Sequence, residues 1–191
     1  MTEAPAYDTT SFVDLIDAFR DLQETLCLVA PPPAATLELT AAVADVTKRL
    51  KEFEAPEGHR VARDREMGSD VHPMLVKYEA TDTSDTSLAG TVTFNHAHMG
   101  GGGAVHGGVI PMLFDDLLGM FVSRRGQPNS RTAFLNVNYR SVTPVLRALR
   151  VDARIEKIEG RKTFVTGTIS DGDLVCAEAE ALFVRLLPGQ P

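Results

Sequence analysis

Tryptophan is absent from the sequence, and cysteine occurs only twice in 191 residues. Cys27 and Cys176 lie far apart and neither belongs to a Cys-x-x-Cys motif, so the sequence offers no disulfide framework. Isolated thiols of this kind are typical of a reducing compartment. No apolar run approaches the roughly 20 residues that a membrane-spanning helix needs, and "MTEAPAYDTT" lacks the basic and apolar regions of a signal peptide. We therefore expect a cytoplasmic protein.

Positive charge is scarce as well. The chain has 19 Lys and Arg against 26 Asp and Glu, a formal net charge of −7, which argues against general nucleic-acid binding. The basic residues are nevertheless concentrated, because the segment from Arg124 to Lys162 holds ten Lys or Arg and three Asp or Glu, a local charge of +7. This segment predicts either an anionic ligand bound nearby or a solvated strand surface, and the sequence leaves both open.

Several familiar motifs are missing from the most unusual stretch, "HMGGGGAVHGGVIPMLFDDLLG" at residues 98–119. It contains neither G-x-x-x-x-G-K-[ST] nor G-x-S-x-G, and it does not lie within a βαβ unit, so nucleotide-binding loops and serine nucleophiles are poor interpretations. Glycine before a helix lets a ligand reach the exposed N–H groups of the first turn. Gly107 and Gly108 are placed to do this, for a phosphate or for the oxyanion of acyl transfer. Close packing of the loop is the alternative.

The remaining pattern predicts two helices followed by an antiparallel sheet. Apolar residues recur at helical spacing from Ser11, the expected N-cap, to the prolines at 31–33, and again from roughly Leu37 to Phe53. Strands are predicted at 74–80 and 88–94 before the glycines, and at 133–141, 150–158, 162–169 and 174–184 after them. A single helix among six strands does not fit a doubly wound parallel sheet. We predict an α+β fold, with a helical extension and connector over 1–73 and, over 74–191, an antiparallel sheet wrapped around one helix.

The helix predicted after the glycines is apolar around about half of its circumference, and Asp115 and Asp116 share the other half. A helix enclosed by a sheet leaves little solvent for two carboxylates, and an unpaired buried charge is costly. At least one aspartate is therefore expected at a cleft or an interface. Asp115 follows Gly107 by eight residues, about 12 Å along the helix axis. Both can reach one carbonyl group only if they come from two different chains.

A metal site is a competing interpretation of the same stretch. His96, His98, His106 and Asp115 would supply three imidazoles and a carboxylate, which is a set that zinc accepts. The glycines leave the geometry of these residues open, and no further Cys or His supports the set. We therefore expect no metal, and we interpret His96 as a solvated loop residue.

The motif "HGGVIPMLFDD", preceded by "HMGGGGAV" and followed by strands ending in "CAEAEALFVR", resembles the PaaI-like hot-dog-fold acyl-CoA thioesterases over roughly residues 74–187. The resemblance implies hydrolysis of acyl-CoA without a cofactor, with Asp115 as general base or nucleophile and the Gly107 N–H as oxyanion donor. It also implies a homodimer with two composite sites, often paired into tetramers. The candidate substrate-binding residues are His98, His106, Gly108 and Asn136. Many relatives have an asparagine six residues before the histidine, where this chain has Gly100.

Two other functions would use the same pocket. A hot-dog dehydratase or hydratase needs a histidine paired with the acid, and His106 is the only candidate nearby. A non-catalytic acyl-CoA-binding module would hold the ligand without turnover. In the hydrolase, the segment Arg124–Lys162 is the candidate for binding the CoA phosphates. The sequence does not predict the identity of the acyl group.

Overall fold

The computed structural model describes residues 8–64, 67–125 and 127–190, which divide into two compact units. The first unit takes in the residues up to Met67 together with Val71–Pro73. The second takes in Gly68–Asp70 and the residues from Met74 onward. No helix among the described residues is long and apolar enough to cross a membrane.

The first unit contains two helices, α1 (Thr9–Leu26) and α2 (Pro33–Lys51), and two short 3₁₀ turns, η1 (Glu57–His59) and η2 (Val61–Arg63). The expected N-cap at Ser11 is wrong, because Asp8 caps α1 by accepting hydrogen bonds from the backbone N–H groups of Thr10 and Ser11 at 3.1 and 3.3 Å. The prolines also act differently from the expectation. α1 already ends at Leu26, and Pro33 begins α2, where its missing N–H costs nothing in the first turn.

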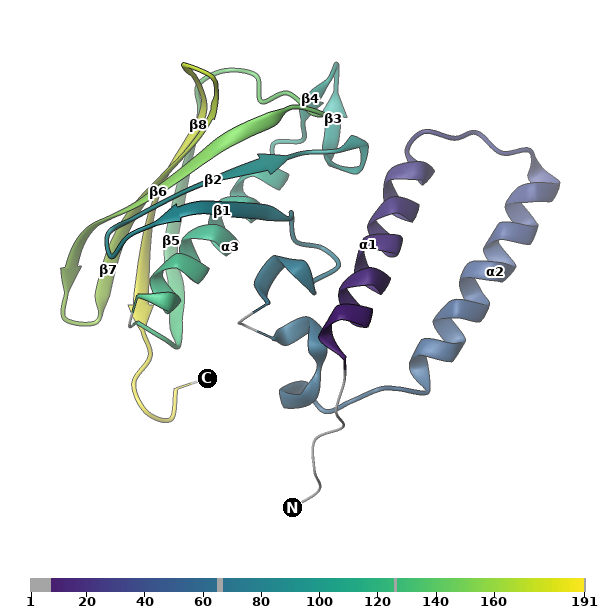
Figure 1. Ribbon diagram of the computed structural model, residues 1–191, viewed down its shortest axis with the longest axis horizontal. Helices are drawn as coiled ribbons and strands as arrows, with labels where there is room; N and C mark the ends of the chain where they lie inside the picture. Colours follow the sequence, from purple (N-terminus) through teal and green to yellow (C-terminus); the bar gives the residue numbers. More distant parts are fainter. Residues whose placement is uncertain (1–7, 65–66, 126, 191) are drawn as a thin grey trace. The chain divides into compact units, whose positions relative to one another are not determined.

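The second unit is built on a six-stranded antiparallel sheet with the strand order β1-β2-β6-β7-β8-β5 (Figure 1). Its strands are β1 (Tyr78–Thr83), β2 (Ser87–Thr93), β5 (Ser130–Tyr139), β6 (Ala148–Glu159), β7 (Lys162–Asp171) and β8 (Leu174–Arg185). The predicted strands are confirmed with shifted ends. The largest shift is at β1, which begins at Tyr78 rather than Met74. Both edges of the sheet, β1 and β5, lack a further strand among the described residues.

One helix, α3 (Val109–Arg124), packs against one face of this sheet, along β5, β6, β7 and β8. Its buried side chains recur at helical spacing: Ile110, Leu113, Phe114, Leu117, Leu118, Phe121 and Val122. They meet the alternate, inward-facing residues of the strands, among them Val151, Val165 and Ala179. The close approach requires Gly167 in β7, because a Cβ there would lie 3.0 Å from the Phe114 ring. The predicted α+β class, a sheet around one central helix, is confirmed.

The glycine stretch before α3 forms more structure than the sequence predicts. It contains the short turn η4 (His96–His98) and a small hairpin of β3 (Met99–Gly101) and β4 (Ala104–Val105). The second unit also includes one earlier turn, η3 (Gly68–Asp70). Gly102 and Gly103 make the hairpin turn with φ of 59° and 77°, a region that favours glycine. The backbone N–H of Val105 donates to the carbonyl of Thr143 at 2.9 Å, which ties β4 to the segment after β5. The stretch is thus a folded lead into α3.

Candidate active site

Asp115 lies exposed on α3 and is held by a side chain of the edge strand. The Thr132 hydroxyl on β5 donates a hydrogen bond to Asp115 Oδ1 at 2.7 Å. Thr132 pairs with Phe183 of β8, whose side chain is buried, so Thr132 faces the helix side of the sheet. The pairing shifts between Thr132 and Phe134, which is a β-bulge. One carboxylate oxygen of Asp115 is therefore fixed, and the other remains available.

Gly107 lies just before α3 and contacts β5 at Tyr139, at the opposite end of the strand from Thr132. Its carbonyl accepts a hydrogen bond from the Tyr139 hydroxyl at 2.5 Å. Its N–H makes no hydrogen bond to any described residue, although it sits just before the N-cap Gly108. The N-terminus of a helix carries partial positive charge on such unpaired N–H groups. The Gly107 N–H is thus an exposed donor on an anchored peptide, as an oxyanion site requires.

His106 and His98 are both engaged in shaping this loop. His106 Nδ1 accepts a hydrogen bond from the Gly108 N–H at 3.0 Å, and the His106 carbonyl accepts one from Val109 at 2.9 Å. His98 Nδ1 accepts from the Asn95 N–H at 3.1 Å, and its ring meets Phe94 edge-on with centroids 5.9 Å apart. The two segments are joined because the His106 N–H donates to the His98 carbonyl at 2.8 Å. These imidazoles, and Gly108, set the conformation at the start of α3.

The described residues contain no group of three or more His, Cys, Asp or Glu side chains that could hold a metal ion. The hypothetical set of His96, His98, His106 and Asp115 is not assembled. The Nδ1 atoms of His98 and His106 accept backbone hydrogen bonds, and Asp115 accepts one from Thr132.

Asp116 has an environment quite different from that of its neighbour. Its Oδ2 atom is buried and has no hydrogen-bond partner among the described residues. Burial, followed by the negative charge of Asp115, raises the pKa of Asp116 to about 6, although Arg124 acts in the opposite direction. Burial and the nearby charge of Asp116 also raise the pKa of Tyr78 on β1. The adjacent aspartates thus differ: Asp115 is exposed and hydrogen-bonded, and Asp116 is largely buried.

Asn136 lies away from this site, and many cations of the basic segment are paired with acidic residues. Asn136 pairs with Glu180, while its neighbours Leu135 and Val137 pack on the core, so Asn136 belongs to the outer face of the sheet. Within one chain it is not brought together with Asp115. Many cations of the basic segment form ion pairs: Arg125–Asp85, Arg140–Glu178, Arg147–Asp171, Arg150–Asp152 and Lys157–Glu159. Much of the local positive charge is therefore compensated.

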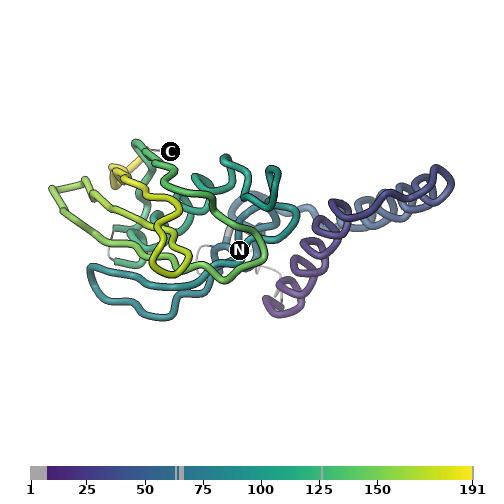
Figure 2. The backbone as a smooth tube through the Cα atoms, turned by 90° about the horizontal axis from the view of Figure 1, so that it is seen from above, coloured from purple at the N-terminus to yellow at the C-terminus, as the bar shows by residue number. Residues whose placement is uncertain are grey.

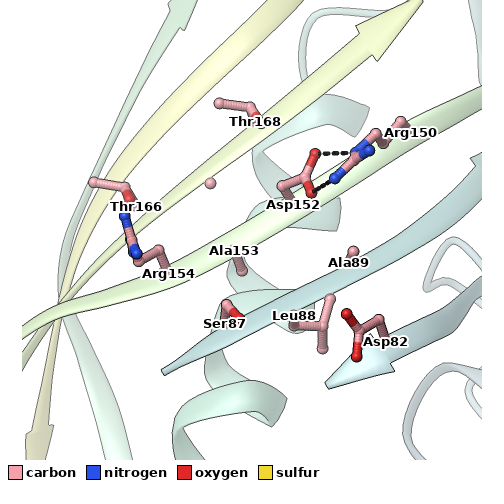
Figure 3. A pocket seen from close by; sticks show the side chains of 11 residues that line it. Asp82, Ser87, Leu88, Ala89, Arg150, Asp152, Ala153, Arg154, Thr166 and Thr168 are labelled. Carbon is pink, nitrogen blue, oxygen red and sulfur yellow. Dashed lines mark hydrogen bonds and ion pairs between the residues drawn. The ribbon is translucent and has the colours of Figure 1, made fainter. Parts of the chain in front are cut away.

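A groove of about 370 Å³ opens on the outer face, across β1, β2, β6 and β7 (Figure 3). Arg150 and Asp152 line it as a bidentate pair, with both N···O distances 2.7 Å, and Arg154 and Thr166 extend it. Arg150 and Arg154 of the predicted basic segment line this groove, but none of the predicted catalytic or other substrate-binding residues does. The candidate active site therefore lies at α3 rather than in this groove.

Two residues that the sequence analysis missed hold the candidate site together. Thr132 fixes Asp115, and Tyr139 fixes Gly107. The strand alternation placed Tyr139 on the same face as Leu135 and Val137, so its direction was readable but its partner was not. Thr132 lay outside the predicted strand, and the bulge that turns it toward α3 has no clear signal in the sequence.

Comparison with known proteins gives a consistent result for the second unit. The model of the thioesterase superfamily matches residues 102–180, which include Gly107, Asp115, Thr132 and Tyr139. The rat acyl-coenzyme A thioesterase THEM4 is 40% identical over 91 residues. These make up 47% of this chain and 39% of the rat protein, so the chain spans well under half of that relative.

Solved structures extend the likeness beyond the matched segment. A crystal structure of a thioesterase superfamily protein covers 91% of this chain and 94% of its own, with a TM-score of 0.77 and 27% identity. A hypothetical thioesterase from Streptococcus pneumoniae, crystallised with coenzyme A, covers 58% of this chain and 86% of its own, with a TM-score of 0.54 and 17% identity. The second likeness concerns the fold alone. Together they identify the sheet around α3 as a hot-dog fold.

Proposed function

Because the chain carries a thioesterase-superfamily domain with a hot-dog fold, we propose that it hydrolyses acyl-CoA thioesters to a free acid and coenzyme A, as a PaaI-like enzyme. The proposal rests on one observation: residues of β5 hold both an oriented carboxylate and a peptide whose N–H is unpaired at the start of a helix. Asp115 is held by Thr132, and the peptide of Gly107 is held by Tyr139. The activity named for THEM4 supports the choice of substrate.

In the proposed reaction, the thioester carbonyl oxygen accepts a hydrogen bond from the Gly107 N–H. Asp115 takes a proton from a water molecule, and the water oxygen bonds to the carbonyl carbon. The oxyanion that forms gains from the partial positive charge of the helix N-terminus. When it collapses, the C–S bond breaks and the thiolate of coenzyme A leaves and takes up the proton. A water nucleophile fits the Thr132 hydrogen bond, which occupies one oxygen of Asp115 and leaves the other to accept from water.

The two groups would meet across a homodimer. β5 is an edge strand, and Phe134 and Tyr139 on it are 41% and 55% exposed. An exposed edge favours pairing with another strand, and two copies related by a two-fold axis would pair β5 antiparallel. The Thr132 end of one strand would then lie opposite the Tyr139 end of the other. This pairing would carry Asp115 of one copy toward Gly107 of its partner, across the gap that one helix cannot close.

Release of free thiol from a panel of acyl-CoAs tests the proposal. We expect Asp115→Asn to lose on the order of 10²–10⁴-fold in kcat, the range for a lost general base. Asp116→Asn, the same change one residue along, is the matched control and should remain within about threefold of the wild type, since Asp116 faces away from the reacting groups. Near-normal turnover by Asp115→Asn on every accepted acyl-CoA would refute the assignment.

The choice between water and direct attack has its own measurement. Under single-turnover conditions in H₂¹⁸O, activation of water places the label in the product acid. Attack by Asp115 would expel the thiolate and leave a mixed anhydride; water that opens it at the aspartyl carbon places the label in the Asp115 carboxylate, where a mass increase of the peptide reveals it. Trapping with hydroxylamine detects an anhydride that water opens at the acyl carbon. We expect the label only in the product.

The alternatives receive no comparable support. A dehydratase needs a histidine paired with the acid, but within one chain His106 Nδ1 accepts from Gly108 and Asp115 accepts from Thr132. The Tm of a non-catalytic acyl-CoA-binding module would rise when acyl-CoA is added, but no thiol would be released. The same panel of acyl-CoAs therefore distinguishes this function from hydrolysis.

A further inference from the structure

The helices of the first unit carry an exposed apolar stripe. It consists of four residues on α1 and four on α2, which we call the hairpin stripe: Leu15, Phe19, Leu22, Leu26, Leu39, Val43, Val46 and Leu50. Their exposed fractions lie between 39% and 60%. The only buried residue of α1 is Ile16, and α2 has no buried residue at all. A surface of this kind is uncommon on a free helix.

The spacing of the stripe is that of a helix-bundle seam. Along each helix the steps are four, three and four residues, from Leu15 to Leu26 and from Leu39 to Leu50. The positions flanking the stripe are uncharged except at Arg49: Ile16, Ala18, Gln23, Thr25, Thr40, Ala42 and Thr47. The five charged residues of α1 occupy the remaining positions. An uncharged band of this width is typical of a helix packed on two neighbours rather than one.

The two helices do not cover each other's part of the stripe. They run antiparallel and are joined at one end by residues 27–32 (Figures 1 and 2). Their backbones approach each other closely at few points along their lengths. Val43 and Val46, in the middle of α2, remain about half exposed as a result. The stripe is therefore not the closed seam of a two-helix hairpin.

The area of the stripe matches what an interface needs. A half-exposed Leu, Val or Phe presents on the order of 80 Å² of apolar surface, so eight of them present on the order of 600 Å². This equals the largest apolar patch of a typical monomer, about 300–600 Å². It also approaches the roughly 800 Å² that each partner contributes to a standard interface, to which flanking residues would add.

We propose that the hairpin stripe docks on the same stripe of a second copy of this chain, forming a four-helix bundle. The two halves of the stripe have equal length, each spanning twelve residues or about 16 Å, so a two-fold arrangement leaves no part unmatched. α1 has four acidic residues and one arginine, a net charge of −3, and α2 has three basic residues against Glu38 and Asp45, a net charge of +1. Placing α1 beside the α2 of the partner therefore avoids setting two acidic helices side by side, with these charges, apart from Arg49, on the faces away from the stripe. This interface is independent of the proposed activity.

A lipid surface is the less suitable occupant. A helix that lies on an anionic membrane carries Lys and Arg on its polar face. The polar face of α1 carries four acidic residues and one arginine. Its charge would oppose such binding.

Cross-linking between chains tests the proposal in the full-length protein. Cys27 is exposed and is replaced by Ser, while the buried Cys176 stays. Two chains of different mass, one with Leu22→Cys and one with Val43→Cys, are refolded together and treated with a short bismaleimide. Because the register along the stripe is open, Phe19→Cys and Leu26→Cys are tested in the same way. We expect covalent dimers linked through stripe positions. The matched control, Asp21→Cys with Ala44→Cys on the charged faces, should give far less product.

A second pair of variants keeps the test decisive. Val43→Glu/Val46→Glu places two charges in the stripe, and Ala41→Glu/Ala44→Glu places two outside it. All four positions are exposed, so neither variant should unfold the chain. The first should abolish the cross-links between stripe positions and lower the sedimentation mass or the hydrogen-exchange protection of α2, and the second should change neither. Links that form only within a doubly substituted Leu22→Cys/Val43→Cys chain would overturn the proposal. So would flotation with anionic vesicles, or product no greater than the control's.

Discussion

Thr132 is a residue whose role depends on one hydrogen bond. Its hydroxyl donates to Asp115 Oδ1 at 2.7 Å and so fixes the plane of the carboxylate. Thr132→Val keeps the branched shape and removes the donor. Since a hydrogen bond to a charged group contributes about 1.5–3 kcal/mol, we expect kcat to fall on the order of 10–100-fold with little change in KM. Steady-state thiol release measures both constants. Thr132→Ser should restore turnover, and equal loss in the Val and Ser variants would instead indicate a packing role.

Asp116 lends itself to a prediction about pH and stability. Its pKa is about 6 in the folded chain, against 3.8 for an unperturbed aspartate. The folded state therefore holds the proton more tightly, and this carboxyl makes folding less stable as the pH rises from about 4 through 6. The difference of 2.2 units corresponds to about 3 kcal/mol as an upper figure. We expect Asp116→Asn to raise the free energy of unfolding by about 1–3 kcal/mol at pH 7.5 and to have almost no effect at pH 4.

Urea titrations of the wild type and Asp116→Asn at the two pH values give the comparison. Asp173→Asn serves as the control, because Asp173 is exposed in the turn between β7 and β8. A gain that is the same at both pH values would show that the Asn side chain itself, rather than loss of the charge, stabilises the fold.

At this scale the sequence predicted residue types better than residue partners. Asp115 and Gly107 were named as candidates from the motif that resembles the PaaI-like thioesterases, and the structure places Asp115 on α3 and Gly107 just before its N-cap. Thr132 was not named, since its direction depends on a bulge, and a shift of one residue sends a strand side chain to the opposite face. Asn136 shows the reverse: its strand was predicted, but it lies on the face away from α3.

At the scale of elements, the order of helices and strands followed from periodicity alone. All six long strands and three long helices were predicted, because alternation and helical spacing extend over many residues. Their ends were less readable. Asp8 caps α1 in place of Ser11, and the hairpin of β3 and β4 was hidden by glycine-rich composition. Caps and turns depend on single residues, so a pattern averaged over a window does not resolve them.

Gly107, just before α3, and Gly90, in β2, make a paired prediction. A Cβ on Gly107 would come no closer than 3.7 Å to Tyr139 Oη, whereas a Cβ on Gly90 in β2 would lie 2.3 Å from the Glu79 carbonyl oxygen. Gly107→Ala should therefore fold with a Tm within about 3 °C of the wild type, yet lose on the order of 10²-fold in kcat as the methyl group crowds the oxyanion position. Gly90→Ala should lose about 1–3 kcal/mol of stability through overpacking. Thermal melts and thiol release distinguish the two, and unimpaired turnover in Gly107→Ala would contradict the oxyanion assignment.

At the scale of the whole molecule, the proposed site is defined by an edge. β5 has one neighbour, β8; its Thr132 binds Asp115 of α3, and its Tyr139, seven residues further along, binds the Gly107 peptide just before α3. The side chains of Thr132 and Tyr139 both face α3. If the β5 strands of two copies paired about a two-fold axis, Asp115 of one copy would therefore lie toward the start of α3 in the other copy. The proposed composite site would follow from this strand geometry, and it predicts how two inactive variants behave together.

Asp115→Asn and Gly107→Ala should complement each other when their chains are mixed and refolded. In a mixed dimer one site receives both substituted groups, while the other receives the intact Asp115 of one chain and the intact Gly107 of its partner. Random mixing makes about half of the dimers mixed, each with one working site, so about a quarter of wild-type activity should return. Asp115→Asn mixed with Thr132→Val is the control, because both lesions lie on the same half of the site and no intact pair can form. If verified mixed dimers show no recovery, Asp115 and Gly107 do not act across two chains, since a shared site must be rebuilt by exchange.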